Sequence, residues 1–202
     1  MMVQKIFAKI QRNKMKINLA ADIQPDSIVD GEGIRTVIWT QGCPHNCNGC
    51  HNTSTHDFND GALIDVEYIK EQIDLLDGQD GITFSGGDPM CQPAACLEIA
   101  KYAKTLNLNI WCYTGYTYEQ LMFLAKSKPS ILEFLKYIDV LVDGKFILEE
   151  KSLDTIFRGS RNQRIIDVQK SLNENKVCLV KKYIEKNKCT DFFIKKEKYL
   201  FV

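Results

Sequence analysis

Residues 42–52 read Gly-Cys-Pro-His-Asn-Cys-Asn-Gly-Cys-His-Asn and place Cys43, Cys47 and Cys50 in the spacing C-x3-C-x2-C. Three thiolates in one short loop can converge on a single metal centre. A four-iron cluster normally takes four cysteines, so three leave one iron without a protein ligand. An open coordination position is typical of a catalytic metal site rather than a structural one. The loop therefore predicts a metal cluster that binds and transforms a small molecule.

Outward from this loop, short apolar segments alternate with amphipathic segments. The predicted strands cover residues 34–41, 81–84, 109–113 and 137–142. The predicted helices cover residues 66–76 and 93–106, and a third begins at the capping box of residues 117–120. Strands that alternate with helices indicate βαβ units, so the expected fold class is α/β with a parallel sheet.

Each predicted strand is followed by residues suited to holding a ligand. The cysteine loop follows the first strand, and the turns after the next three strands are Ser85-Gly86-Gly87-Asp88-Pro89, Thr114-Gly115 and Asp143-Gly144-Lys145. The carboxyl ends of parallel strands meet at one edge of a sheet, where α/β proteins bind their ligands. The four segments are therefore expected to form one site.

The composition is ordinary for a globular protein, with 45% hydrophobic and 26% charged residues among 202. This length favours one domain with a substantial core. The sequence contains no apolar run that would span a membrane and no apolar segment typical of a secretory signal. Eight cysteines in such a chain favour metal or redox chemistry over disulfide bonds. A cytoplasmic enzyme without membrane contact is expected.

The net charge of zero conceals two basic ends. Residues 1–16 hold five basic and no acidic residues, and residues 169–202 hold nine lysines and four acidic residues. Solvated surface is the preferred interpretation of both ends, and the acidic middle of the chain argues against a nucleic-acid partner. The predicted organisation is a basic segment at 1–23, a central domain at 24–168 and a basic extension at 169–202.

The spacing C-x3-C-x2-C is the signature of the radical S-adenosylmethionine (SAM) superfamily. Within it, the chain resembles the activating proteins of glycyl-radical enzymes, most of all those of anaerobic ribonucleoside-triphosphate reductase. The resemblance covers residues 24–168, where the matching segments appear in the family's order. These segments are Asp30-Gly31-Glu32-Gly33-Ile34-Arg35, Cys50-His51-Asn52, Thr83-Phe84-Ser85-Gly86-Gly87-Asp88-Pro89, Tyr113-Thr114-Gly115-Tyr116, residues 139–146 and residues 157–164.

The resemblance implies a fold, cofactors and partners. The fold would be the partial (βα) barrel of the radical SAM type, open on one side. Cys43, Cys47 and Cys50 would hold a [4Fe-4S] cluster, and reductive cleavage of SAM at the open iron would give methionine and a 5′-deoxyadenosyl radical. This radical SAM oxidoreductase would generate a glycyl radical on anaerobic ribonucleotide reductase. Flavodoxin or ferredoxin would donate the electron, and a homodimer or a complex with the reductase dimer is the implied assembly.

The resemblance also implies SAM contacts at the strand ends. Gly86 and Gly87 lack Cβ atoms, so their backbone can approach the SAM amino group closely. Asp88 stands where many superfamily members have glutamate. A bulky residue in place of Gly87 is expected to weaken SAM binding and to leave the cluster intact. The other expected SAM contacts are Asn52, Ser85, Thr114, Asp143 and Lys145.

Structural alternatives stay open for most of these residues. The cysteines could bind zinc together with His45 or His51, because C-x2-C also suits zinc. A tight turn would account for two adjacent glycines, a turn for Asn52 and a cap or turn for Thr114. Strand alternation puts Asp143 and Lys145 on one face, where they could instead form a surface ion pair. Three arginines could bind the SAM carboxylate or dock the partner, although solvated surface is preferred for each; they are Arg158, Arg161 and Arg164.

Several other features receive structural interpretations. Gly31-Glu32-Gly33 resembles half of a dinucleotide fingerprint but precedes a strand, so it is rejected as one. Residues 3–10 have helical spacing, and residues 175–184 and 191–202 look like strands of a terminal hairpin or of an extension. The remaining cysteines, which are expected to be buried and free, are Cys91, Cys96, Cys112, Cys178 and Cys189.

Two rival functions accompany the main interpretation. One is a small-molecule radical SAM enzyme such as a deazapurine carboxylate synthase, which a glycyl radical on an added partner would exclude. The other is a non-catalytic iron–sulfur or zinc protein, which cleavage of SAM by the reduced protein would exclude.

Overall fold

The computed structural model describes residues 14–184, which form an eight-stranded sheet with helices. The strand order is β4-β1-β3-β5-β6-β7-β8, and β2 pairs with β3 outside this path. The strands are β1 (Lys16–Leu19), β2 (Gln24–Ser27), β3 (Arg35–Thr40), β4 (Ala62–Asp65), β5 (Gly81–Gly86), β6 (Asn109–Tyr113), β7 (Val140–Asp143) and β8 (Arg164–Asp167). The sheet does not close on itself.

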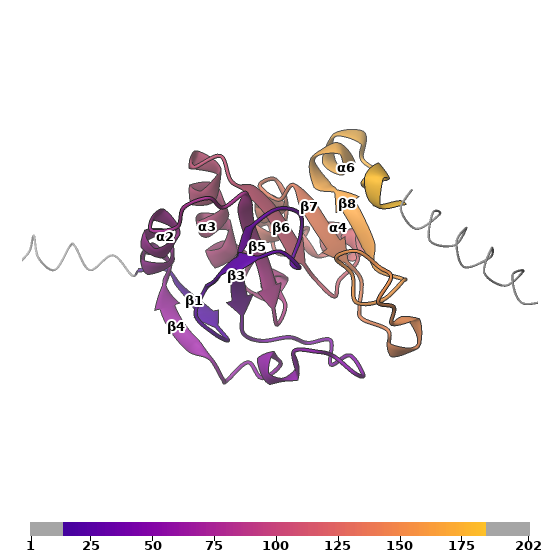
Figure 1. The fold of residues 1–202 in the computed structure, drawn as a ribbon, viewed down its shortest axis with the longest axis horizontal. Helices are drawn as coiled ribbons and strands as arrows, with labels where there is room; N and C mark the ends of the chain where they lie inside the picture. Colours follow the sequence, from indigo (N-terminus) through magenta and orange to yellow (C-terminus); the bar gives the residue numbers. More distant parts are fainter. Residues whose placement is uncertain (1–13, 185–202) are drawn as a thin grey trace, which may run out of the picture.

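The four central strands, β3, β5, β6 and β7, are parallel, and the flanking pairs are antiparallel. Thr40 at the end of β3 lies opposite Gly86 at the end of β5. The loop after β3 and the turn after β5 therefore leave the sheet side by side. Figure 1 shows the loop after β3 and the segment after β7 at the same, lower edge of the sheet.

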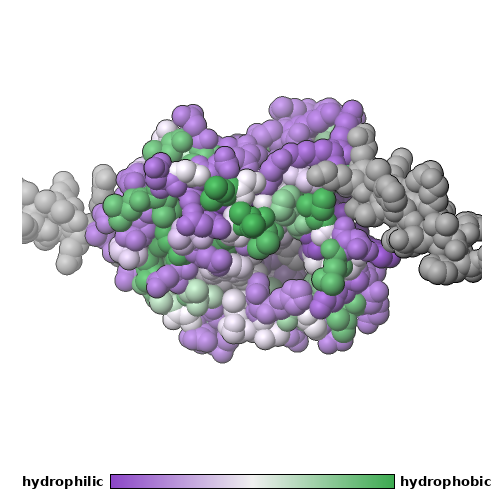
Figure 2. Space-filling model, in the orientation of Figure 1, coloured by the Kyte–Doolittle hydropathy of each residue, from purple (hydrophilic) through white to green (hydrophobic). Residues whose placement is uncertain are grey.

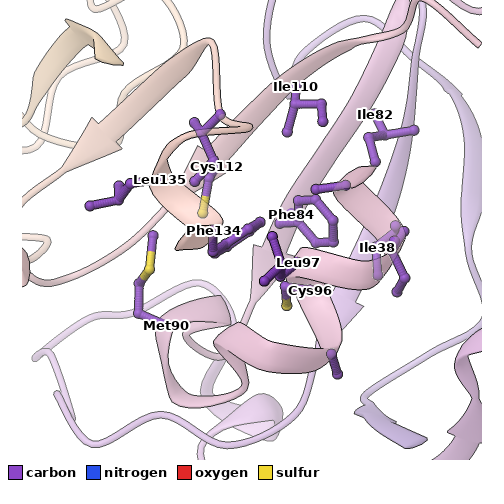
Figure 3. Close-up of a cluster of buried hydrophobic side chains, with 14 of the residues drawn as sticks. Ile38, Ile82, Phe84, Met90, Cys96, Leu97, Ile110, Cys112, Phe134 and Leu135 are labelled. Carbon is purple, nitrogen blue, oxygen red and sulfur yellow. The ribbon is translucent and has the colours of Figure 1, made fainter. Parts of the chain in front are cut away.

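Helices cover one face of the sheet. The α-helices are α2 (Val66–Asp74), α3 (Pro93–Thr105), α4 (Tyr118–Leu124), α5 (Ser130–Leu135) and α6 (Val168–Glu174). Short 3-10 turns occur at η1 (Thr53–Thr55), η2 (Pro89–Cys91) and η3 (Leu148–Glu150). Alternate strand residues such as Ile38, Phe84 and Cys112 face these helices and join one buried core (Figure 3). Phe84 meets Phe134 of α5 edge to face, with ring centroids 5.2 Å apart.

The opposite face carries a smaller apolar cluster and one buried arginine. Trp111 and Val142 pack there with Tyr183. Arg35 is fully buried. Its guanidinium donates to the backbone carbonyl oxygens of Glu32 (2.9 Å), Ile82 (2.5 Å) and Asn109 (2.9 Å). Burial lowers the pKa of Arg35 to about 10, and the bonded carbonyl dipoles offset part of the cost of that burial.

The α/β fold class and the open sheet are confirmed, and the predicted central elements match those observed within a few residues. The four central strands and α2, α3 and α4 were all predicted. Sequence patterns missed β1, β2, β4, β8, α5 and α6. The sequence of β2, Gln-Pro-Asp-Ser, is a polar edge strand with an irregular register and has no alternating pattern to recognise.

The strand predicted over residues 175–184 is wrong. Asn175 ends α6 in a left-handed conformation (φ 51°). Leu179 makes a single bridge to Ile166, and residues 181–184 are helical. The expected helix at 3–10, the strand at 191–202 and Cys189 lie outside the described residues. No helix in the described range has both the length and the apolar character needed to cross a membrane.

Candidate metal and cofactor site

The carboxyl ends of β3, β5, β6 and β7 surround a cavity of about 180 Å³. The surface is hollowed right of centre in Figure 2, over the region where Figure 1 places these strand ends and the segment after β7. The predicted residues that line the cavity are Cys43, Cys47, Cys50, Asn52, Ser85, Gly86, Gly87 and Thr114. Predicted residues from three separate segments are thus brought together at one edge of the sheet, and the fourth segment, after β7, contributes Gly144 to the lining.

Local backbone geometry shapes the cysteine loop. Gly42 (φ 95°) and Gly49 (φ 72°) adopt left-handed conformations that favour glycine. The amide of Cys43 donates to the carbonyl oxygen of His56 (3.1 Å), which fixes the root of the loop. A Cβ at Gly49 would lie 2.9 Å from the Leu148 side chain, so this position has little room for a larger residue.

The donor set fits a cluster with an open iron better than a zinc site. Cys43, Cys47 and Cys50 are free, half-buried and arranged around one cavity, whose lining, among the residues that the structure describes, contains no fourth cysteine. In residues 14–184 no three His, Cys, Asp or Glu side chains are grouped as ligands for a single ion. Zinc requires all its ligands at one centre, whereas in a four-iron cluster each cysteine binds its own iron. Burial raises the pKa of the Cys43 thiol, so metal binding there must displace a proton.

The two glycines after β5 allow the turn to pack against the cysteine loop. A Cβ at Gly86 (φ 101°) would lie 2.6 Å from the carbonyl oxygen of Thr40, and one at Gly87 would lie 2.4 Å from that of Gly42. The backbone amide of Gly87 donates a hydrogen bond to the carbonyl oxygen of Thr40 (2.7 Å). Close backbone packing is therefore a sufficient structural reason for both glycines.

This packing changes the expected effect of a substitution at Gly87. We now expect Gly87→Val to lower both iron content and SAM binding, because the new side chain must displace the Gly42 backbone at the root of the cysteine loop. Iron analysis of anaerobically reconstituted protein measures this, with Gly78→Asn as the control, since a Cβ at Gly78 meets no atom within 4 Å and asparagine tolerates the left-handed φ of 70° there. If Gly87→Val keeps its full iron content and binds SAM more weakly, the substitution affects SAM alone, as the sequence suggested.

Asp88 lies beneath the cavity and does not line it. Its fully buried carboxylate accepts hydrogen bonds from Thr114 Oγ1 (3.0 and 2.9 Å), the Gly115 amide (3.0 Å) and the Met90 amide (2.9 Å). His45 Nε2 lies 2.6 Å from Asp88 Oδ2. From the sequence, His45 was expected to be a loop residue or a zinc ligand, and its contact with Asp88 was not predicted.

Asp143 and Lys145 do not form the ion pair that strand alternation suggested. Asp143 is buried and accepts from Arg164 Nε (2.9 Å) and from the Tyr118 amide (2.7 Å). The Lys145 side chain is exposed and does not line the cavity. Arg164 also pairs with Glu119 and lowers the pKa of that carboxyl to about 2. The carboxylate of Asp143 is thus engaged by Arg164 and not by Lys145.

The other two arginines differ from Arg164. Arg158 is half-buried and donates through Nη1 to the carbonyl oxygen of Gln163 (3.0 Å), while its buried Nε has no hydrogen-bond partner in the described part of the chain. Arg161 is exposed. The prediction that solvated surface accounts for each arginine therefore holds for Arg161 and is wrong for Arg164.

The cysteines outside the loop differ in burial. Cys96 and Cys112 are fully buried, as predicted, and burial raises the pKa of both thiols. Cys91 and Cys178 are free but only half-buried. Cys91 lies close enough to Cys43 for the two thiols to interact electrostatically.

Comparison with known proteins identifies the family around this site. A family model described as "4Fe-4S single cluster domain" matches residues 29–166. The chain is 38% identical over 152 residues to the anaerobic ribonucleoside-triphosphate reductase-activating protein of Enterobacteria phage T4, covering 71% of this chain and 90% of the relative. Proteins of the same name from Vibrio cholerae (41% over 150 residues) and Escherichia coli K12 (34% over 148 residues) match 70% and 69% of this chain, and 92% of each relative.

Proposed function

Because this chain belongs to the family of anaerobic ribonucleoside-triphosphate reductase-activating proteins, we propose that it activates an anaerobic ribonucleoside-triphosphate reductase by generating a glycyl radical on that enzyme. It is a radical SAM oxidoreductase that uses a [4Fe-4S] cluster and SAM. One observation supports this proposal above all others: three free thiols surround one cavity, and no fourth cysteine within residues 14–184 lines it. That donor set suits a cluster with one iron open to a small molecule.

The bound cofactors supply the difficult chemistry, which is reductive cleavage of SAM to methionine and a 5′-deoxyadenosyl radical that abstracts a hydrogen atom. The protein holds and orients them. Cys43, Cys47 and Cys50 bind three irons. Polar and backbone groups at the strand ends hold SAM beside the cluster, and those that line the cavity are Asn52, Ser85, Gly86, Gly87 and Thr114.

We propose that Asp143 and Lys145 do not contact SAM in the way that the sequence suggested. The Asp143 carboxylate keeps Arg164 in place at the start of β8, and Arg164 connects it to Glu119 in the first turn of α4. We propose that Asp143 supports the edge of the cavity through this network rather than by touching SAM. Lys145, which is exposed, can reach SAM or the partner only after its side chain moves.

The fold and partners follow from the same proposal. The open sheet is a partial (βα) barrel of the radical SAM type formed by residues 24–168 together with β1 (Lys16–Leu19), and its open side admits the glycine-bearing segment of the reductase. Flavodoxin or ferredoxin donates the electron, the protein works in the cytoplasm, and it acts as a homodimer or in complex with the reductase dimer. No residue of the basic segments 1–23 and 169–202 is assigned a role in the chemistry.

The test uses protein reconstituted with iron and sulfide under anaerobic conditions. After reduction, added SAM should be converted to 5′-deoxyadenosine and methionine, and a glycyl radical should form when the reductase is present. SAM cleavage with no radical on the reductase would favour the small-molecule enzyme. A reduced cluster that leaves SAM intact would favour the electron carrier.

A further inference from the structure

His45 connects the cysteine loop to the neighbouring strand ends. It stands midway between Cys43 and Cys47, yet its side chain is only 6% exposed. Its Nε2 lies 2.6 Å from Oδ2 of Asp88, whose side chain is 1% exposed. Because both groups are shielded from water, this contact is stronger than the same contact on the surface.

Asp88, which follows β5, extends the connection to the end of β6. Its carboxylate accepts from the Met90 amide after β5 and from Thr114 Oγ1 and the Gly115 amide after β6. Together with His45, these donors occupy both carboxylate oxygens, so little acceptor capacity remains for a ligand. The absence of Asp88 from the cavity lining agrees with this count.

The His45 ring has little freedom to leave this position. The Tyr116 ring meets it edge to face with centroids 4.4 Å apart. A Cβ added at Gly115 would lie 2.3 Å from Cδ2 of the ring. The lack of a side chain at Gly115 therefore gives the ring its space.

We propose that His45 is a positioning residue that fixes the cysteine loop relative to the ends of β5 and β6 through Asp88. The cluster is held by the loop after β3, and SAM is held in part at the ends of β5 and β6. His45 thus sets the placement of the cluster relative to SAM, and Asp88 acts through these hydrogen bonds without touching SAM. The inference rests on the proposed function and adds two positioning residues to it.

The test compares four variants after anaerobic reconstitution. His45→Ala removes the contact. His45→Gln keeps a donor that reaches about as far as Nε2. Gly115→Ala retains His45 but forces its ring away, without backbone strain, because Gly115 does not have a left-handed φ. His45 and Gly115 themselves line the cavity, whereas Asp88 does not. Asp88→Asn, which weakens the contact from outside the lining, is therefore measured alongside them and should weaken SAM binding to a similar degree. Iron content, SAM affinity by calorimetry and the change that SAM causes in the electron paramagnetic resonance (EPR) spectrum of the reduced cluster are measured.

We expect His45→Ala and Gly115→Ala to keep their iron but to bind SAM about 10–100-fold more weakly, the usual cost of removing a residue that orients a metal site. Their EPR spectra should change less on SAM addition than that of the unmodified protein. His45→Gln should recover most of the lost affinity. The control Glu98→Gln, which breaks an exposed ion pair with Lys101 on α3 (2.7 Å), should behave as the unmodified protein.

Unchanged SAM affinity in His45→Ala and Gly115→Ala would overturn the inference. Loss of iron in both His45→Ala and His45→Gln would also overturn it, because His45 would then be a ligand. If His45→Ala does not fold, Gly115→Ala decides the question. Failure of the unmodified protein to bind SAM would contradict the proposed function itself, which separates the two failures.

Discussion

Alanine in place of any one of Cys43, Cys47 and Cys50 will yield protein that retains no stable four-iron cluster and cleaves SAM only at the background rate. The unmodified protein should hold about four irons and four sulfides per chain after anaerobic reconstitution, the content of one [4Fe-4S] cluster. Each thiolate binds a separate iron, so the other two cannot replace the one that is lost. Iron and sulfide analysis together with the visible absorption spectrum measure the result.

Two matched controls test whether the cluster has an open iron. Cys178→Ala removes a half-buried thiol beside α6, away from the cavity, and should leave the iron content unchanged. Cys91→Ala is the more stringent control, because this thiol is near enough to Cys43 to interact with it electrostatically. Loss of the cluster in Cys91→Ala would make Cys91 a fourth ligand and would contradict the open iron. Zinc without iron in the unmodified protein would contradict the cluster.

Arg35→Met should cause a large loss of stability for a single substitution outside the cysteine loop. The guanidinium bonds to three carbonyl oxygens and to Thr83 Oγ1 (2.7 Å), and it lies over the Trp111 ring, 5.6 Å from the centroid. Methionine fills part of the space but leaves these buried acceptors without donors. We expect the free energy of unfolding to fall by about 3 kcal/mol or more, which lowers Tm by roughly 6–12 °C in a chain of this size.

Thermal unfolding of anaerobically reconstituted protein measures this effect. The Tm of Arg35→Lys should lie between that of the unmodified protein and that of Arg35→Met, because an ammonium group keeps the charge but cannot reach every acceptor. The control is Arg161→Met at an exposed position, for which a change within about 0.5 kcal/mol is expected. A Tm for Arg35→Met equal to that of the control would show that the buried hydrogen bonds do not contribute to stability as described.

The central sheet could be predicted because its strands are apolar and each ends at a recognisable turn. Residues 109–113 were predicted and observed as β6. The flanking strands could not be predicted in the same way. β1 and β4 have four residues each, and β8 is a short antiparallel partner of β7. Such short strands outside the parallel centre are specified by pairing with the rest of the sheet more than by their own sequences.

The cysteine loop was evident from sequence because its ligands are neighbours in the chain. The contact of His45 with Asp88 was not, because it joins residues 43 positions apart. It depends on the register that sets the end of β3 beside the end of β5, with Thr40 opposite Gly86. The histidine between two of the cysteines was visible as a pattern, but its partner became evident only from this pairing.

Unpredicted strand pairing also explains why Asp143 and Lys145 have other contacts than the sequence suggested. Strand alternation placed Asp143 and Lys145 on one face and suggested that they interact. In the structure, Arg164 of the antiparallel strand β8 lies opposite Asp143 and pairs with it. A partner on a strand that the sequence did not reveal could not enter the prediction.

The most direct test of the central claim is EPR spectroscopy of the reduced protein, SAM and the anaerobic reductase mixed without oxygen. The account predicts a doublet from a glycyl radical on the reductase, formed only when SAM and an intact cysteine loop are present. The doublet should disappear when the target glycine of the reductase is changed to alanine. SAM cleavage that proceeds without any radical on the reductase would contradict the claim that this protein is its activase.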